Sequence, residues 1–333
     1  MSVCQLDASI ERKQLDGFQF PLGVYPVEPM EPRAGYMVLF EPADGDNEEG
    51  DLEEWPDRYV YDIVVPAPRL RALVFALLQL LPQRVYPILD VMGNDAYREM
   101  DPFISYDLMG LDRFIHALER YGPFFFEDGL CGFGAMCDDP FVYLFVDEHK
   151  IVTVRIREED REKLDKVLEA FDLREIAEPA GADASSHEHR SVLMVPDDAA
   201  PYWGIEEILE ELREEWKLVL NVDPERNVDE EGRELGITPW RCIVKPGGAP
   251  PGEGKFVEVL LEAPNLNAAE DLARQGAAEA ASEPMDQWID SIVLAAERHT
   301  PETFADALQQ LGAEMPAGAC PELGRVVRAV VHE

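Results

Sequence analysis

The chain has 333 residues, 46% of them hydrophobic, and carries 68 acidic against 29 basic side chains, a formal charge of −39. The hydrophobic content suffices for a substantial core, which excludes a wholly disordered polyelectrolyte, and the length predicts roughly two domains. Because so acidic a field repels phosphates and anionic lipids, we expect neither direct nucleic-acid binding nor membrane association.

The N-terminal segment and the cysteines predict a cytoplasmic protein. Residues 1–17 contain no basic stretch followed by an apolar one, so nothing there marks the chain for secretion. The longest apolar run, 72–81, falls short of the ~20 residues that span a bilayer, and it predicts a buried helix. Five cysteines are an odd number in a long chain, which favours free thiols over a disulfide framework.

The first domain is expected at 36–176, with the proline-punctuated residues 1–35 as an extended arm lying on it. An acidic loop, 41–57, holds nine acids and no base between two predicted strands. The strands are expected at 36–40, 59–65, 124–126, 142–146 and 151–156, and the helices at 72–81, 111–121 and 164–171.

Residues 177–190 are small and polar and predict a linker, followed by a second domain at 191–333. Thr300, Pro301 and Gly312 supply the start and stop signals of one helix in that domain. Further helices are expected at 205–216, 266–281 and 285–298, and strands at 191–195, 218–222, 240–244, 256–261 and 325–331. Helices and strands alternate irregularly, so we predict an α+β protein of two compact domains with mixed or antiparallel sheets.

One group of side chains has the composition of a metal-binding or catalytic site. Cys131, Cys137 and His149 supply the ligand types of a thiolate-imidazole zinc centre, and a cysteine–histidine nucleophile pair would use a subset of them. The acids Glu127, Asp128, Asp138 and Asp139 lie in the same stretch. The spacing fits no usual metal pattern and buried cysteines commonly act as small hydrophobes, so we expect no cofactor, with zinc as the alternative.

His187 and His189 fall in the predicted linker, where a mobile pair makes a poor preformed site. Complete nucleotide, calcium and hydrolase motifs are absent from the sequence.

The first hypothesis is therefore a non-catalytic interaction protein that docks a basic protein partner or masks a nucleic-acid-binding face. Its docking residues are expected in the acidic loop: Asp44, Asp46, Glu48, Glu49, Asp51, Glu53 and Glu54. One alternative is an enzyme of unassigned class with a site around 127–149, and another is a self-assembling structural subunit. A further alternative is that the acidic surface provides only solubility in a salt-rich cytoplasm.

Overall fold

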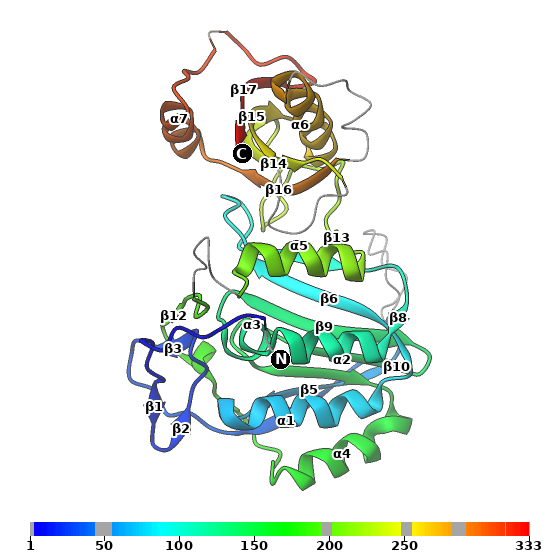
Figure 1. The fold of residues 1–333 in the computed structure, drawn as a ribbon. Coiled ribbons are helices and arrows are strands. Elements are labelled where there is room, and N and C mark those ends of the chain that lie inside the picture. The colour runs from blue at the N-terminus through cyan, green and yellow to red at the C-terminus, as the bar shows by residue number, and fades with distance from the viewer. Residues whose placement is uncertain are drawn as a thin grey trace. The chain divides into compact units, whose positions relative to one another are not determined.

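The computed structural model describes residues 3–43, 55–194, 202–247, 255–281, 291–316 and 318–332 (Figure 1). Their contacts form two compact units, unit 1 (Met1–Val91 and Pro102–Leu220) and unit 2 (Met92–Asp101 and Asn221–Glu333). Both units combine helices with antiparallel sheets, which confirms the α+β prediction. Apart from the excursion Met92–Asp101, the chain passes from unit 1 to unit 2 after Leu220, and the expected linker 177–190 lies within unit 1.

The main sheet of unit 1 has the strand order β13-β7-β6-β9-β10-β11-β5-β4, with β8 paired to β6. Alternate residues of the central strands, such as Phe133, Leu144 and Val154, are buried in one core because successive side chains point to opposite faces. The strands are β4 (Gly35–Glu41), β5 (Arg58–Val64), β6 (Arg84–Met92), β7 (Met100–Ile104), β8 (Met109–Gly110), β9 (Cys131–Asp138), β10 (Phe141–Val146), β11 (Val152–Ile156) and β13 (Val219–Leu220).

Helices α1, α2, α4 and α5 lie over one side of this sheet, and their apolar side chains join its core (Figure 1). The helix predicted at 205–216 is α5, and its apolar stripe is buried, with Ile208 and Leu212 at 0% exposure. The helical elements are α1 (Ala67–Leu77), η1 (Leu78–Leu80), α2 (Leu111–Arg120), α3 (Gly122–Glu127), η2 (Glu158–Asp160), α4 (Arg161–Ala170) and α5 (Ile205–Trp216).

The strand predicted at 124–126 is wrong, because these residues belong to helix α3. Pro123 stands in its first turn, where the missing N–H costs nothing. The rings of Phe124, Phe125 and Phe126 are all buried, and Phe125 packs on both Phe133 and Trp216. A stretch buried on every side shows no periodicity that separates helix from strand.

The N-terminal residues pack on unit 1 through short strands, β1 (Gln14–Leu15), β2 (Phe18–Gln19) and β3 (Val24–Pro26). β3 pairs with β12 (His187–His189), and η3 (Ala182–Ala184) precedes β12. The strand predicted at 191–195 is reduced to one bridge between Leu193 and Leu6, while residue 195 lies outside the described residues.

Unit 2 has a four-stranded antiparallel sheet in the order β16-β14-β15-β17. Helix α6 lies against it at Gly276, where an added Cβ would stand 3.2 Å from side-chain atoms of Val259 and Val326. Phe304 of α7 packs on Leu260, and the N-cap predicted at Thr300 is confirmed by its bond from Thr303 N. The elements are β14 (Thr238–Lys245), β15 (Phe256–Ala263), α6 (Leu266–Ala281), β16 (Ile292–Arg298), α7 (Pro301–Gln310) and β17 (Arg325–His332).

The helix predicted at 285–298 is wrong over its described part, because Ile292–Arg298 is strand β16. Its Leu-Ala-Ala-Glu run favours a helix, yet the segment pairs with β14 along most of its length. Tertiary pairing overrides a local propensity of a few tenths of a kcal/mol per residue. Residues 285–290 lie outside the described part of the chain.

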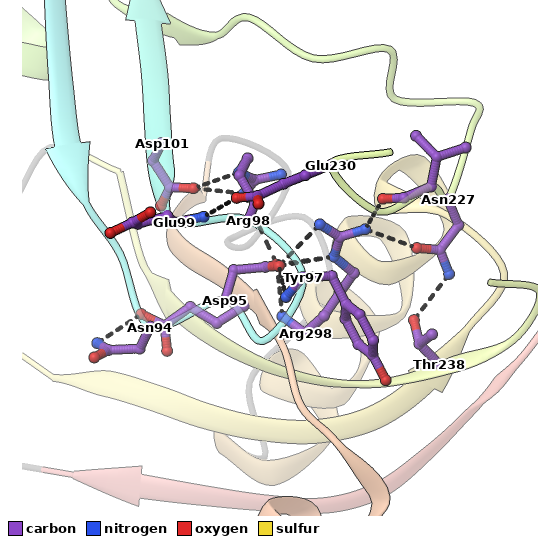
Figure 2. A network of polar contacts seen from close by, with 12 residues as sticks. Asn94, Asp95, Tyr97, Arg98, Glu99, Asp101, Asn227, Glu230, Thr238 and Arg298 are labelled. Carbon is purple, nitrogen blue, oxygen red and sulfur yellow. Dashed lines mark hydrogen bonds and ion pairs between the residues drawn. The ribbon is translucent and has the colours of Figure 1, made fainter. Parts of the chain in front are cut away.

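A buried ion pair joins segment 92–101 to β16 within unit 2 (Figure 2). Arg298 donates from Nε to Asp95 Oδ2 at 2.9 Å and from Nη2 to Asp95 Oδ1 at 2.8 Å, and its backbone N–H donates to Oδ2 at 2.9 Å. Its Nη1 donates to Asn227 Oδ1 at 3.1 Å and to the Val228 carbonyl at 2.6 Å. The side chains of Asp95 and Arg298 are 0% and 5% exposed, so both charges depend on these partners.

Candidate metal centre

Three histidines from two separate segments meet in unit 1. His149 lies in the turn between β10 and β11, while His187 and His189 are the first and last residues of β12. Strand alternation puts His187 and His189 on one face of β12 and Glu188 on the other.

The β10–β11 turn is held by Asp147. Its carboxylate accepts a hydrogen bond from Ile151 N at 2.7 Å, and its carbonyl accepts one from Lys150 N at 3.0 Å. Lys150 adopts a left-handed conformation with φ of 65°, which closes the turn. This tight turn fixes where His149 projects.

Strand β12 is held by its ladder with β3, in which His187 pairs with Pro26 and His189 with Val24. On the opposite face Glu188 accepts a hydrogen bond of 2.5 Å from the Tyr25 hydroxyl. The His187 and His189 side chains are therefore carried on paired backbone.

The imidazole rings converge edge to face, with centroids 4.7, 4.8 and 5.0 Å apart. The Nε2 atoms of His149 and His187 lie 3.0 Å apart. One ring nitrogen from each of the three histidines lies within 4.8 Å of the others.

The outward-facing Nδ1 atoms determine which nitrogens carry protons. His187 Nδ1 lies 2.7 Å from the Ser185 carbonyl and His189 Nδ1 lies 2.7 Å from the Gly129 carbonyl. A carbonyl oxygen only accepts, so both Nδ1 atoms must donate a proton. In neutral His187 and His189 the lone pair is consequently at Nε2, and in His187 this atom faces His149 Nε2.

His149 follows the same pattern with carboxylates. Its Nδ1 lies 3.4 Å from Asp147 Oδ2 and 3.2 Å from Glu148 Oε1. Burial by itself would lower the pKa of His149, but hydrogen bonding and charge from these two carboxylates raise it above its ordinary value. An Nδ1–H bound to a carboxylate makes Nε2 a stronger electron donor.

Neutral His149 and His187 would bring two lone pairs face to face across 3.0 Å, which is unfavourable unless a proton or a cation lies between them. Zinc binds imidazole nitrogen at about 2.0–2.1 Å, so two nitrogens on one tetrahedral ion stand about 3.3 Å apart. Burial lowers the pKa of His189, which keeps it neutral and able to coordinate.

Cys131 and Cys137 lie at the start and near the end of β9, and both belong to the buried core of unit 1. Cys131 Sγ donates to the Phe124 carbonyl at 3.2 Å, and burial raises the pKa of its thiol to about 12. Cys137 Sγ donates to the Pro140 carbonyl at 2.8 Å, and burial raises the pKa of its thiol to about 11. Within the described residues neither thiol joins His149 in a group with metal-binding geometry.

Of the acids in the predicted cluster, Glu127 and Asp128 accept hydrogen bonds from neighbouring segments, whereas Asp138 and Asp139 are exposed. Glu127 binds Arg12 through two contacts of 2.7 and 2.9 Å, which ties the N-terminal residues to α3. Asp128 is fully buried and accepts hydrogen bonds from Leu130 N, Ser191 Oγ and Val192 N. Asp138 is exposed at the end of β9.

The expected docking residues of the acidic loop, Asp44, Asp46, Glu48, Glu49, Asp51, Glu53 and Glu54, lie outside the described residues.

Sequence reasoning did not place His187 and His189 beside His149, because their surroundings are polar and poor in apolar anchors. The available signal was their spacing, since two histidines separated by one residue share a face if the segment is a strand. Nothing local indicated that the segment would pair with β3.

No family model matches the chain, and neither a curated protein nor a solved structure does. Among the described residues, every helix is too short or too polar to cross a bilayer.

Proposed function

We propose that this protein binds one divalent transition-metal ion, zinc by ligand chemistry, through His149, His187 and His189. The observation that carries the proposal is the 3.0 Å approach of two Nε2 atoms whose rings are held from behind at Nδ1. Imidazole suits zinc, copper, iron and nickel, and outer hydrogen bonds from each ring are the usual support of metal-bound histidine.

Three protein ligands leave a coordination position for water. Structural zinc sites are almost always closed by four protein ligands, whereas catalytic sites keep three and hold water in the fourth position. Zinc lowers the pKa of that water to about 7, which supplies hydroxide at neutral pH. The side chain of His149 is 18% exposed, so solvent can reach this edge of the cluster. We therefore propose a water-activating, hydrolytic metal centre, a form of the enzyme alternative with different ligands.

The ion would also join two parts of the chain, because His149 and His187 lie 38 positions apart in sequence. A ligand that binds only the folded state stabilises it by about 2.7 kcal/mol at a concentration of 100 Kd. Metal binding should therefore raise the unfolding temperature as well as complete the centre.

The test is elemental analysis and zinc titration of protein purified without a polyhistidine tag. We expect one zinc per chain, and His187→Asn or His189→Asn should weaken binding at least tenfold. His116→Asn is the matched control because His116 is exposed on α2. Cys131→Ser and Cys137→Ser should keep the metal, which separates this centre from a thiolate site.

Cobalt substitution adds a spectroscopic measurement, since tetrahedral Co²⁺ absorbs in the visible range and the spectrum should disappear in His189→Asn. Protein that binds no zinc, or that binds it equally well in His187→Asn and His116→Asn, refutes the proposal.

The net charge supports a second proposed function, docking of a basic protein. Residues 1–180 hold 37 acids and 17 bases, and residues 181–333 hold 31 and 12, so both halves of the chain attract a cationic partner. Recovery of such a partner from lysate at moderate salt, and its loss at high salt, is the expected result. Capture that is indifferent to salt contradicts an electrostatic interface.

A further inference from the structure

A second feature of unit 1 is a cavity of about 380 Å³ on the side of the sheet that faces away from α1–α5. Its floor is formed by Tyr86 of β6 and Met136 of β9. The residues before and after Met136, Ala135 and Cys137, point into the helix-covered core, so Met136 points the other way. The volume falls in the range of about 300–1,000 Å³ typical of small-molecule sites.

Four of the ten lining residues are aromatic: Trp55, Tyr106 and Phe141 in the walls and Tyr86 in the floor. The Trp55 ring stands edge-on to Phe141, with centroids 5.6 Å apart. The flat faces of these aromatic side chains complement a planar ring better than a flexible aliphatic chain.

Trp55 is held in place before any ligand arrives. The guanidinium of Arg155 lies 4.9 Å from the centre of its ring, and that of Arg58 lies 5.2 Å away. The Tyr143 ring also contacts Trp55, at a centroid distance of 5.5 Å. A wall supported in this way loses little conformational entropy on binding.

One cationic side chain lines the cavity, that of Arg157, which is half-buried just beyond the end of β11. Arg157 has no side-chain hydrogen bond or ion pair with the residues that the structure describes. The Ser105 hydroxyl, also in the lining, is already engaged with the backbone of Asp107 at 3.1 and 3.2 Å. Arg157 is thus the polar group of the lining best placed to bind an anionic ligand group.

We propose that this cavity binds a planar aromatic carboxylate, with its ring against Trp55 and Tyr86 and its carboxylate on Arg157. A guanidinium matches a carboxylate through two parallel hydrogen bonds. Asp138 is also in the lining, and its negative charge together with the acidic protein disfavours a dianion such as a phosphate ester. The ligand class is therefore a monoanionic ring acid.

The test uses 2-naphthoate and its neutral counterpart 2-naphthamide as probes, with methyl-labelled Met136 as the reporter in NMR. 2-Naphthoate should shift the Met136 methyl signal in a saturable way, and 2-naphthamide should bind at least tenfold more weakly. Arg157→Gln should remove this difference by weakening 2-naphthoate alone. Arg174→Gln, which changes an exposed arginine elsewhere in unit 1, should bind both probes as the unchanged protein does.

Two outcomes would overturn the assignment: no saturable Met136 shift with either probe, or equal binding of the two probes to the unchanged protein. Retention of the full preference for 2-naphthoate in Arg157→Gln would do the same. The cavity is lined by none of the three histidines, so His187→Asn should leave 2-naphthoate binding intact. The outcome is consequently independent of the metal centre.

Discussion

Replacing Asp95 by alanine tests how strongly the buried ion pair stabilises unit 2. The change removes the acceptor for Nε, Nη2 and the backbone N–H of Arg298, and leaves a guanidinium that is 5% exposed. Breaking a buried pair on one side typically costs about 3–5 kcal/mol. Because Asn227 and Val228 still accept from Nη1, we expect the lower end, about 3 kcal/mol.

Hydrogen exchange measures this loss one element at a time. A cost of about 3 kcal/mol corresponds to a loss of amide protection on the order of 100-fold in β14 and β15. Protection in β9 and β10 of unit 1 should be unchanged. Asp271→Ala is the control, since its carboxylate is 87% exposed and 3.7 Å from Arg274, and such pairs contribute at most about 1 kcal/mol.

Adding Arg298→Met to Asp95→Ala should restore part of the protection, because no unpaired charge is then buried. If Asp95→Ala lowers protection no more than Asp271→Ala does, the ion pair does not hold unit 2 together and the reasoning fails.

Three further outcomes are expected. In Gly129→Ala the new Cβ would stand 2.0 Å from the Gly23 carbonyl oxygen, so overpacking should lower the free energy of unfolding in urea by about 1–3 kcal/mol. Zinc affinity should also fall, because the Gly129 carbonyl anchors His189. An unchanged urea midpoint would contradict this prediction. Burial raises the pKa of Asp90 to about 7 from 3.8. The folded protein therefore holds this proton more tightly than the unfolded chain, and the resulting contribution to folding stability is complete below pH 3.8 and is lost as the pH rises to about 7. Asp90→Asn should therefore gain stability relative to the unchanged protein at pH 8 but not at pH 4, by on the order of a few kcal/mol, and parallel pH profiles would refute the assignment. Neutralising the acids of 44–54 to Asn or Gln should slow association with a basic partner and flatten the salt dependence of that association, while folding is retained. A partner whose binding responds neither to these substitutions nor to salt would place the interface elsewhere.

Local signals in the sequence were sufficient for several elements. The apolar stripe of α5 and the proline and N-cap of α7 predict helices from residues within two turns of one another, and both are present. The turn at 147–150 was predictable for the same reason, since Asp147 bonds to residues only three and four positions away.

Composition determined the acidic character, and the irregular alternation of the predicted helices and strands determined the α+β class. What only the tertiary structure decided were the elements and sites that depend on distant partners. β16 is a strand because β14 lies beside it, despite its helix-favouring residues. The histidines become one cluster because β3 pairs with β12 and brings a segment 38 residues away to His149. Such contacts carry no short-range pattern, because their stability comes from pairing between residues that the sequence keeps far apart.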